Sequence, residues 1–192
     1  MIVVGIIALV SAIAYPSLSA SLAEGRLADG ATDTMSAMQF ARFQALLRGR
    51  AQVVEFRTNI ALDAPTASDP WVVRVRESLS QACNNVAGGA TRRVFMPKSV
   101  RLTTVLPADV QGSGICFKPD GKVYEAASAT PISMDGDEQA QFNQGRAGNL
   151  GVRFRRYERV GNNAIEVGVR KEVVLSHLGI ARLNPELAAN VE

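Results

Sequence analysis

The sequence predicts an α+β fold in which one long N-terminal helix packs on an antiparallel β-sheet. Three observations favour this fold class. Residues 1–23 carry no charge, residues 24–50 repeat apolar side chains at helical spacing, and the remaining chain alternates apolar and polar residues along short segments. Because 47% of the 192 residues are hydrophobic, the composition is typical of a folded chain and excludes a largely disordered one.

Residues 1–23 begin with the run MIVVGIIALVSAIAYP, and the first ionisable side chain is that of Glu24. As a helix, this half would reach about 35 Å, enough to cross a bilayer core of about 30 Å. A segment this apolar must be buried in lipid, in a partner or in an assembly. We interpret it as a membrane-anchoring or filament-core half. Pro16 predicts a kink, because proline removes a backbone donor and clashes with the preceding turn.

Residues 24–50 continue the helix as its amphipathic half. The apolar positions recur every three or four residues, at Leu27, Ala31, Met35, Met38, Ala41, Ala45 and Leu46. The spacing predicts one helix over residues 1–49. We expect its second half to pack on the sheet through Leu27, Ala31, Met35, Met38 and Leu46.

Residues 51–192 are predicted to form one globular β-rich domain. Period-two alternation or short apolar runs predict strands at 51–58, 71–78, 92–96, 100–106, 114–118, 122–126, 150–157, 164–171 and 172–176. Pro119-Asp120-Gly121 predicts a tight turn, because proline presets φ and glycine accepts a positive φ. Residues 63–70 and 128–148 are expected to be loops.

The segment MIVVGIIALVSAIAYPSL resembles the N-terminal helix of type IV pilins and type II secretion pseudopilins, with Pro16 at the place of the family's proline. Three further segments resemble the GspH/FimT group of minor pilins: MSAMQFARFQALLRGRAQVVEF, ICFKPDGKV (115–123), and VVLSHLGIARL (173–183), which looks like the closing strands. The resemblance implies a pilin-like fold and a structural subunit. It also implies a single-pass protein of the bacterial inner membrane with a periplasmic domain, whose partners are other pilins or pseudopilins.

The chain starts inside the helix of the resembled family, so the leader peptide, its glycine cleavage site and the family's N-terminal glutamate are not in this sequence. We expect coding sequence upstream of Met1 to supply them.

The two cysteines, Cys83 and Cys116, match no zinc-ligand spacing, and no histidine lies near either in sequence. In the periplasm that the resemblance implies, a disulfide between them would persist. Two buried reduced thiols are the alternative.

Motifs for catalysis are absent from the sequence. His177 is the single histidine, and there is no G-x-S-x-G, H-E-x-x-H, Walker or G-x-G-x-x-G pattern. Asp135, Asp137 and Glu138 lack the spacing of a calcium-binding loop and read as a solvated acidic loop. We therefore expect no enzymatic activity and no catalytic, cofactor or metal site.

Positive charge is concentrated near the C-terminus. Residues 143–183 hold eight Lys or Arg against three Glu, whereas residues 1–142 are neutral overall. Some members of the resembled family bind DNA through arginines near the final strands, and here the matching place reads Gly179-Ile180-Ala181-Arg182. A basic face holds a phosphate backbone without reading sequence. The candidate DNA-binding residues are Arg153, Arg155, Arg170, Lys171 and Arg182, and a solvated basic surface is the alternative.

The sequence therefore favours a minor pilin or pseudopilin that helps to initiate or cap a type IV pilus or a type II secretion pseudopilus. One alternative is a DNA-binding minor pilin that acts as a receptor in natural transformation. A second alternative is a membrane-anchored binding domain for a secreted protein.

Overall fold

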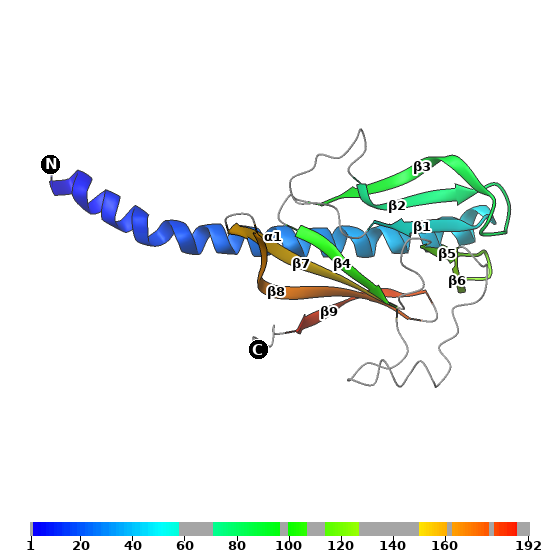
Figure 1. Ribbon diagram of the computed structural model, residues 1–192. Coiled ribbons are helices and arrows are strands. Elements are labelled where there is room, and N and C mark those ends of the chain that lie inside the picture. The colour runs from blue at the N-terminus through cyan, green and yellow to red at the C-terminus, as the bar shows by residue number, and fades with distance from the viewer. Residues whose placement is uncertain are drawn as a thin grey trace.

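A computed structural model describes residues 2–57, 71–96, 100–106, 114–126, 150–160, 163–176 and 179–187. One helix, α1 (Ile2–Arg48), carries two antiparallel sheets on its C-terminal half, as Figure 1 shows. The predicted α+β fold with a long N-terminal helix on antiparallel strands is confirmed. The strands form two sheets where the sequence suggested one.

The first sheet has the strand order β3-β2-β1-β5-β6. Its strands are β1 (Gln52–Phe56), β2 (Trp71–Ser78), β3 (Val86–Phe95), β5 (Ile115–Phe117) and β6 (Val123–Glu125). The predicted turn between β5 and β6 is present: the N–H of Gly121 donates to the carbonyl of Lys118 at 3.0 Å, and Gly121 has a φ of 79°. β3 begins at Val86, whereas the sequence predicted a strand only from residue 92. The first half was missed because the glycines at 88 and 89 interrupt the alternation that indicates a strand.

The second sheet has the order β4-β7-β8-β9. Its strands are β4 (Val100–Leu106), β7 (Leu150–Val160), β8 (Asn163–Leu175) and β9 (Ala181–Leu187). The predicted strands at 164–171 and 172–176 are one strand, β8, which pairs with β7 through a register shift. Alternation missed β9 because it contains Asn184-Pro185, which normally marks a turn; an edge strand tolerates proline.

The core lies between α1 and the inner faces of both sheets. Small and medium side chains of the helix are fully buried there: Leu27, Ala31, Ala37, Met38, Ala41 and Ala45. They pack against buried strand residues such as Val54, Phe117, Val152 and Phe154, and Met35 packs at the edge of this core. The prediction for Leu46 is wrong, because Ala45 faces the sheets and Leu46 is rotated away and 47% exposed.

The N-terminal half of α1 extends beyond both sheets and curves in its dark blue part (Figure 1). The helix continues unbroken through Pro16, and the kink there stays a prediction because that side chain lies outside the description. In the described part of the chain, no helix is both long and apolar enough to span a membrane. Most side chains of residues 1–23 lie outside that part, as do the predicted loops at 63–70 and 128–148 and the residues Asp135, Asp137, Glu138 and His177.

Candidate functional site

The basic residues near the C-terminus gather mainly on the outer face of the second sheet. Arg153 and Arg155 flank the fully buried Phe154, so they point away from the core. Arg182 of β9 pairs in register with Val174, which in turn pairs with Gly151 of β7. Cross-strand partners share a face, and Arg182 therefore lies on the same side as Arg153.

Carboxylates already neutralise three of the predicted DNA-binding residues. Arg153 Nε lies 3.2 Å from Glu172 Oε1. Arg155 Nη1 and Arg170 Nε lie 2.5 and 2.8 Å from the two carboxylate oxygens of Glu166. The net positive charge of this face is therefore smaller than the arginine count suggests.

Glu172 is almost fully buried and depends on a glycine beside it. A Cβ placed on Gly151 would lie 2.7 Å from Glu172 Oε1, which is closer than real contacts allow. The glycine thus leaves the space in which the Glu172 carboxylate faces Arg153.

The arginines around Glu166 set its ionisation. Burial by itself raises the pKa of Glu166, but the hydrogen bond from Arg170 and the charge and hydrogen bond of Arg155 outweigh it, and the pKa lies below its ordinary value. The carboxylate is therefore held in its charged form.

The other two predicted DNA-binding residues behave differently. Lys171 pairs in register with Phe154, so it lies on the core side of the sheet and is half-buried. Arg182 is exposed and has no ion pair with any described residue.

Sequence reasoning missed Arg101 of β4, which is the cross-strand neighbour of Arg155. The guanidinium of Arg101 lies 5.1 Å from the ring centroid of Tyr157. Its place in the sequence between the apolar residues Val100 and Leu102 was a signal that it faces outward.

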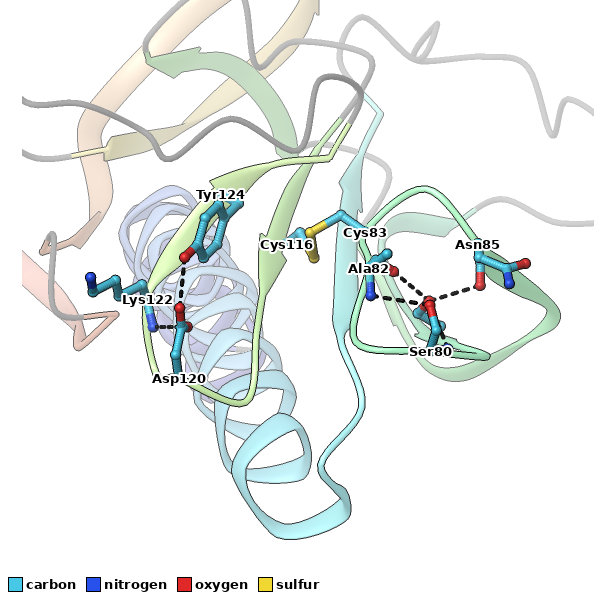
Figure 2. Close-up of a disulfide and its surroundings, with 9 residues drawn as sticks. Ser80, Ala82, Cys83, Asn85, Cys116, Asp120, Lys122 and Tyr124 are labelled. Atoms are coloured by element: carbon cyan, nitrogen blue, oxygen red, sulfur yellow. Dashed lines mark hydrogen bonds between the residues drawn. A yellow bond between two sulfur atoms is a disulfide. The ribbon is translucent and has the colours of Figure 1, made fainter.

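A disulfide joins Cys83, in the β2–β3 connection, to Cys116 of β5, with the two Cα atoms 5.9 Å apart (Figure 2). It lies on the outer side of the first sheet within a small second core. The members of that core are Ala51, Val53, Cys83, Cys116, Tyr124 and Ala126.

Beside the disulfide, the Tyr124 hydroxyl donates to Asp120 at 2.6 Å, and the Lys122 amide donates to the same carboxylate at 2.9 Å (Figure 2). Burial raises the pKa of Asp120, but these two hydrogen bonds and the nearby lysine charges outweigh it and lower the pKa. The same bond to Asp120, with burial, raises the pKa of Tyr124. This cluster closes the β5–β6 turn, and the raised pKa of Tyr124 keeps its hydroxyl protonated. Among the described residues, no three metal-binding side chains cluster.

The outward face of α1 is the remaining candidate surface. Four of its large apolar residues fall within a sector of about 60° on a helical wheel. They are Leu18, Leu22, Phe43 and Leu47, and all are more than half exposed. This sector lies opposite the buried residues Leu27 and Ala45. α1 therefore presents one face to its own sheets and another that its own described residues leave uncovered.

The comparisons with known proteins agree with this architecture. The profile of the family described as type II transport protein GspH matches residues 30–152, from the covered half of α1 into β7. The searches of curated proteins and of solved structures gave no match. Pseudopilins of this family are structural subunits and not enzymes. The match covers most of the chain, which therefore belongs to the GspH family and is a pseudopilin of type II secretion.

Proposed function

We propose that this chain is a minor pseudopilin that helps to initiate or cap the type II secretion pseudopilus. Residues 1–23 hold it in the inner membrane, with residues 51–192 in the periplasm, until it enters the filament. There the same apolar half packs among the helices of neighbouring pseudopilins. In this proposal residues 24–50 join the two parts, as the half of the helix that belongs to the folded domain.

The contrast between the two halves of α1 carries the proposal. In the second half, one face of the helix is buried by strands of both sheets. In the first half, the described large side chains Val3, Leu18 and Leu22 are 67%, 61% and 56% exposed. An apolar helix of this length needs lipid or partner helices around it, and a pseudopilin meets both in turn.

Complementation of secretion tests the role. In a bacterium whose own GspH-type subunit is deleted, the full chain with its upstream coding sequence should restore type II secretion. Ala8→Arg should abolish this, because it places a charge in the apolar half. The matched control is Ala28→Arg, at a partly exposed helix position in the domain half. Equal secretion by all three would overturn the proposal.

Antibody labelling tests the minor position in the filament. In cells that overproduce pseudopili, an antibody against the sheet domain should label filament ends. Continuous label along the filament would show a major subunit and would contradict initiation or capping.

DNA binding is the second candidate, and it is supported by the shared face of Arg153, Arg155 and Arg182, with Arg101 beside them. Purified full chain in detergent, titrated with labelled duplex at about 50 and 200 mM salt, tests it. A receptor should bind without sequence preference, and Arg182→Ala should weaken binding and lower the salt slope by about one unit. Arg26→Ala, an exposed arginine on α1, is the control. Absence of binding at the lower salt would remove this candidate.

A further inference from the structure

The end of β7 and the beginning of β8 lie at the edge of the second sheet from which the N-terminal half of α1 emerges (Figure 1). This edge contacts the helix where its charge-free half ends, since a Cβ placed on Gly168 of β8 would lie 3.8 Å from Glu24 Oε1. The opposite end of β8 leads to the other end of the helix, because a Cβ on Gly179 would lie 3.1 Å from Arg42 Cδ. The part of β8 before Gly168 is therefore the part nearest to the apolar half.

The folded domain begins almost directly after that apolar half. Leu22 is 56% exposed, Glu24 is the first ionisable residue, and Leu27 is already buried under the strands. Glu24 and Leu27 lie about 4.5 Å apart along the helix axis. The headgroup layer of one leaflet is about 5–7 Å thick. With residues 1–23 crossing the hydrocarbon layer along its normal, the edge of the second sheet beside Glu24 must lie at the depth of the lipid headgroups.

The side chains at this edge combine positive charge with aromatic and apolar surface. We call five of them the proximal cluster: Arg101 of β4, Arg155 and Tyr157 of β7, and Ile165 and Arg170 of β8. Tyr157 is half-buried, and the Arg101 guanidinium lies 5.1 Å from the centroid of its ring. Tyrosine and arginine are both suited to the boundary between lipid and water, because each has an apolar body and a polar tip.

The proximal cluster has more positive charge than the carboxylate beside it neutralises. Arg101 and Arg155 are register partners on the outer face, so two like charges lie opposite each other. Glu166 is shared between Arg155 and Arg170, at 2.5 and 2.8 Å. Arg101 Nε has no hydrogen-bond partner among the described residues. Three guanidinium groups therefore share one carboxylate, and an anion from outside the domain would be attracted to them.

Ile165 adds apolar surface at the same edge. It pairs in register with Glu158, a position of β7 that alternation places on the same face as the buried Phe154. Ile165 is nevertheless 47% exposed. The core therefore does not extend to this end of β8, and the isoleucine is available to the apolar part of the headgroup layer.

We propose that the proximal cluster docks on the anionic lipid headgroups of the inner membrane while the subunit is anchored there. The inference rests on the proposed function, because it needs residues 1–23 in the bilayer. The arginines bind lipid phosphates, and Tyr157 and Ile165 lie among the headgroups. Duplex DNA offers the same phosphate chemistry, but the position beside Glu24, at headgroup depth, favours lipid. Docking holds the domain against the membrane on the side of the second sheet, and entry into the filament must break this contact.

Fluorescence quenching of the full chain in lipid nanodiscs measures docking. Both native cysteines are in the disulfide, so a thiol introduced by Ile165→Cys can be labelled alone. The matched control is Leu79→Cys, which is also exposed but lies at the far end of α1, where the Ala51 amide donates to the carbonyl of Ser80. A quencher on the lipid headgroup should quench the label at 165 several-fold more than the label at 79. Equal quenching at the two positions would overturn the proposal.

Lipid charge provides the second arm. Quenching at 165 should be stronger in discs that contain phosphatidylglycerol than in discs of phosphatidylcholine alone, and no dependence on lipid charge would overturn the proposal. In the anionic discs, Arg101→Gln should lower the ratio of docked to undocked domains about fivefold, as expected for one basic residue at such a surface. Arg50→Gln removes the same charge at the far end of the molecule, where its side chain is 54% exposed, and should change nothing. Equal effects of the two variants would contradict docking through the proximal cluster.

Two further outcomes separate this inference from the other proposals. If duplex DNA changes the fluorescence at 165 in neutral discs more than anionic lipid does, the cluster belongs to the DNA-binding candidate and the inference fails. If the chain restores secretion but the label at 165 is quenched no more than the label at 79, the inference fails and the proposed function stands. If Ala8→Arg secretes like the wild type, the proposed function fails whatever the quenching shows.

Discussion

The two sheets stabilise their outer faces in related but unequal ways. Each holds one glutamate between two arginines: Glu55 pairs with Arg74 and Arg76 in the first sheet, as Glu166 does with Arg155 and Arg170 in the second. Only the first sheet adds a covalent link among the described residues. Its strands β5 and β6 have three residues each, whereas β7 and β8 have 11 and 13. The long strands β7 and β8 pair over ten residue positions, whereas the short strand β5 pairs over three on each side and is tied covalently to the β2–β3 connection as well.

The largest expected effect comes from removing that disulfide. Cys83→Ser with Cys116→Ser should lower the free energy of unfolding by about 3–4 kcal/mol, because the bond closes a loop of 33 residues in the unfolded chain. Urea denaturation of the full chain in detergent, followed by circular dichroism, measures it. Reductant should destabilise the wild type by the same amount and leave the variant unchanged. Two free thiols in denatured, unreduced periplasmic protein would contradict the bond.

The second-largest loss of stability is expected from removing the charge of Glu172, the buried carboxylate of the second sheet. Glu172→Gln should cost about 1–3 kcal/mol, because it removes the negative charge facing Arg153 in a buried place. Glu77→Gln in the first sheet is the matched control. Its partners Arg48 and Arg50 are more than half exposed, so we expect a loss below about 1 kcal/mol. Equal losses of unfolding free energy in the two variants would show that the burial of Glu172 does not make its ion pair more stabilising than that of Glu77.

Acid should weaken the second sheet through Glu166. Its pKa is lower in the folded state than its ordinary value of 4.5. The stabilisation is therefore fully present above about pH 4.5 and is lost as the pH falls through the folded pKa. Unfolding free energies measured from pH 7 to pH 3 should decline less steeply in Glu166→Gln than in the wild type. Parallel pH profiles would refute the assignment.

The smallest effect is expected at Gln52 of β1, which faces the core with 1% exposure. Neither its amide nitrogen nor its amide oxygen has a hydrogen-bond partner among the residues that the structure describes. Gln52→Leu should leave stability unchanged or raise it by about 1 kcal/mol, because it removes buried polar atoms without breaking a described bond. A clear loss in thermal unfolding would show that the amide is satisfied.

The sequence predicted the individual helix and strands better than it predicted which strands pair with one another. The charge-free run and the helical spacing located α1, and Pro119-Asp120-Gly121 located a turn, because these are local signals. The division into two sheets depends on distant pairings, such as Val54 with Ile115, which alternation does not report. For the candidate site, the sequence located the concentration of arginines but not the carboxylates that lie beside three of them. Glu172 reaches Arg153, and Glu166 reaches Arg155, only because β7 pairs with β8.

The position of α1 between the sheets also has a mechanical consequence. No strand of one sheet pairs with a strand of the other within the described ranges, and α1 packs against both. A force that pulls on the N-terminal half would therefore act on both sheets at the same time. It would slide α1 along the sheets, against the contacts of its buried alanine and methionine side chains. Resistance to such a pull is spread over the whole length of the covered helix and does not rest on one strand.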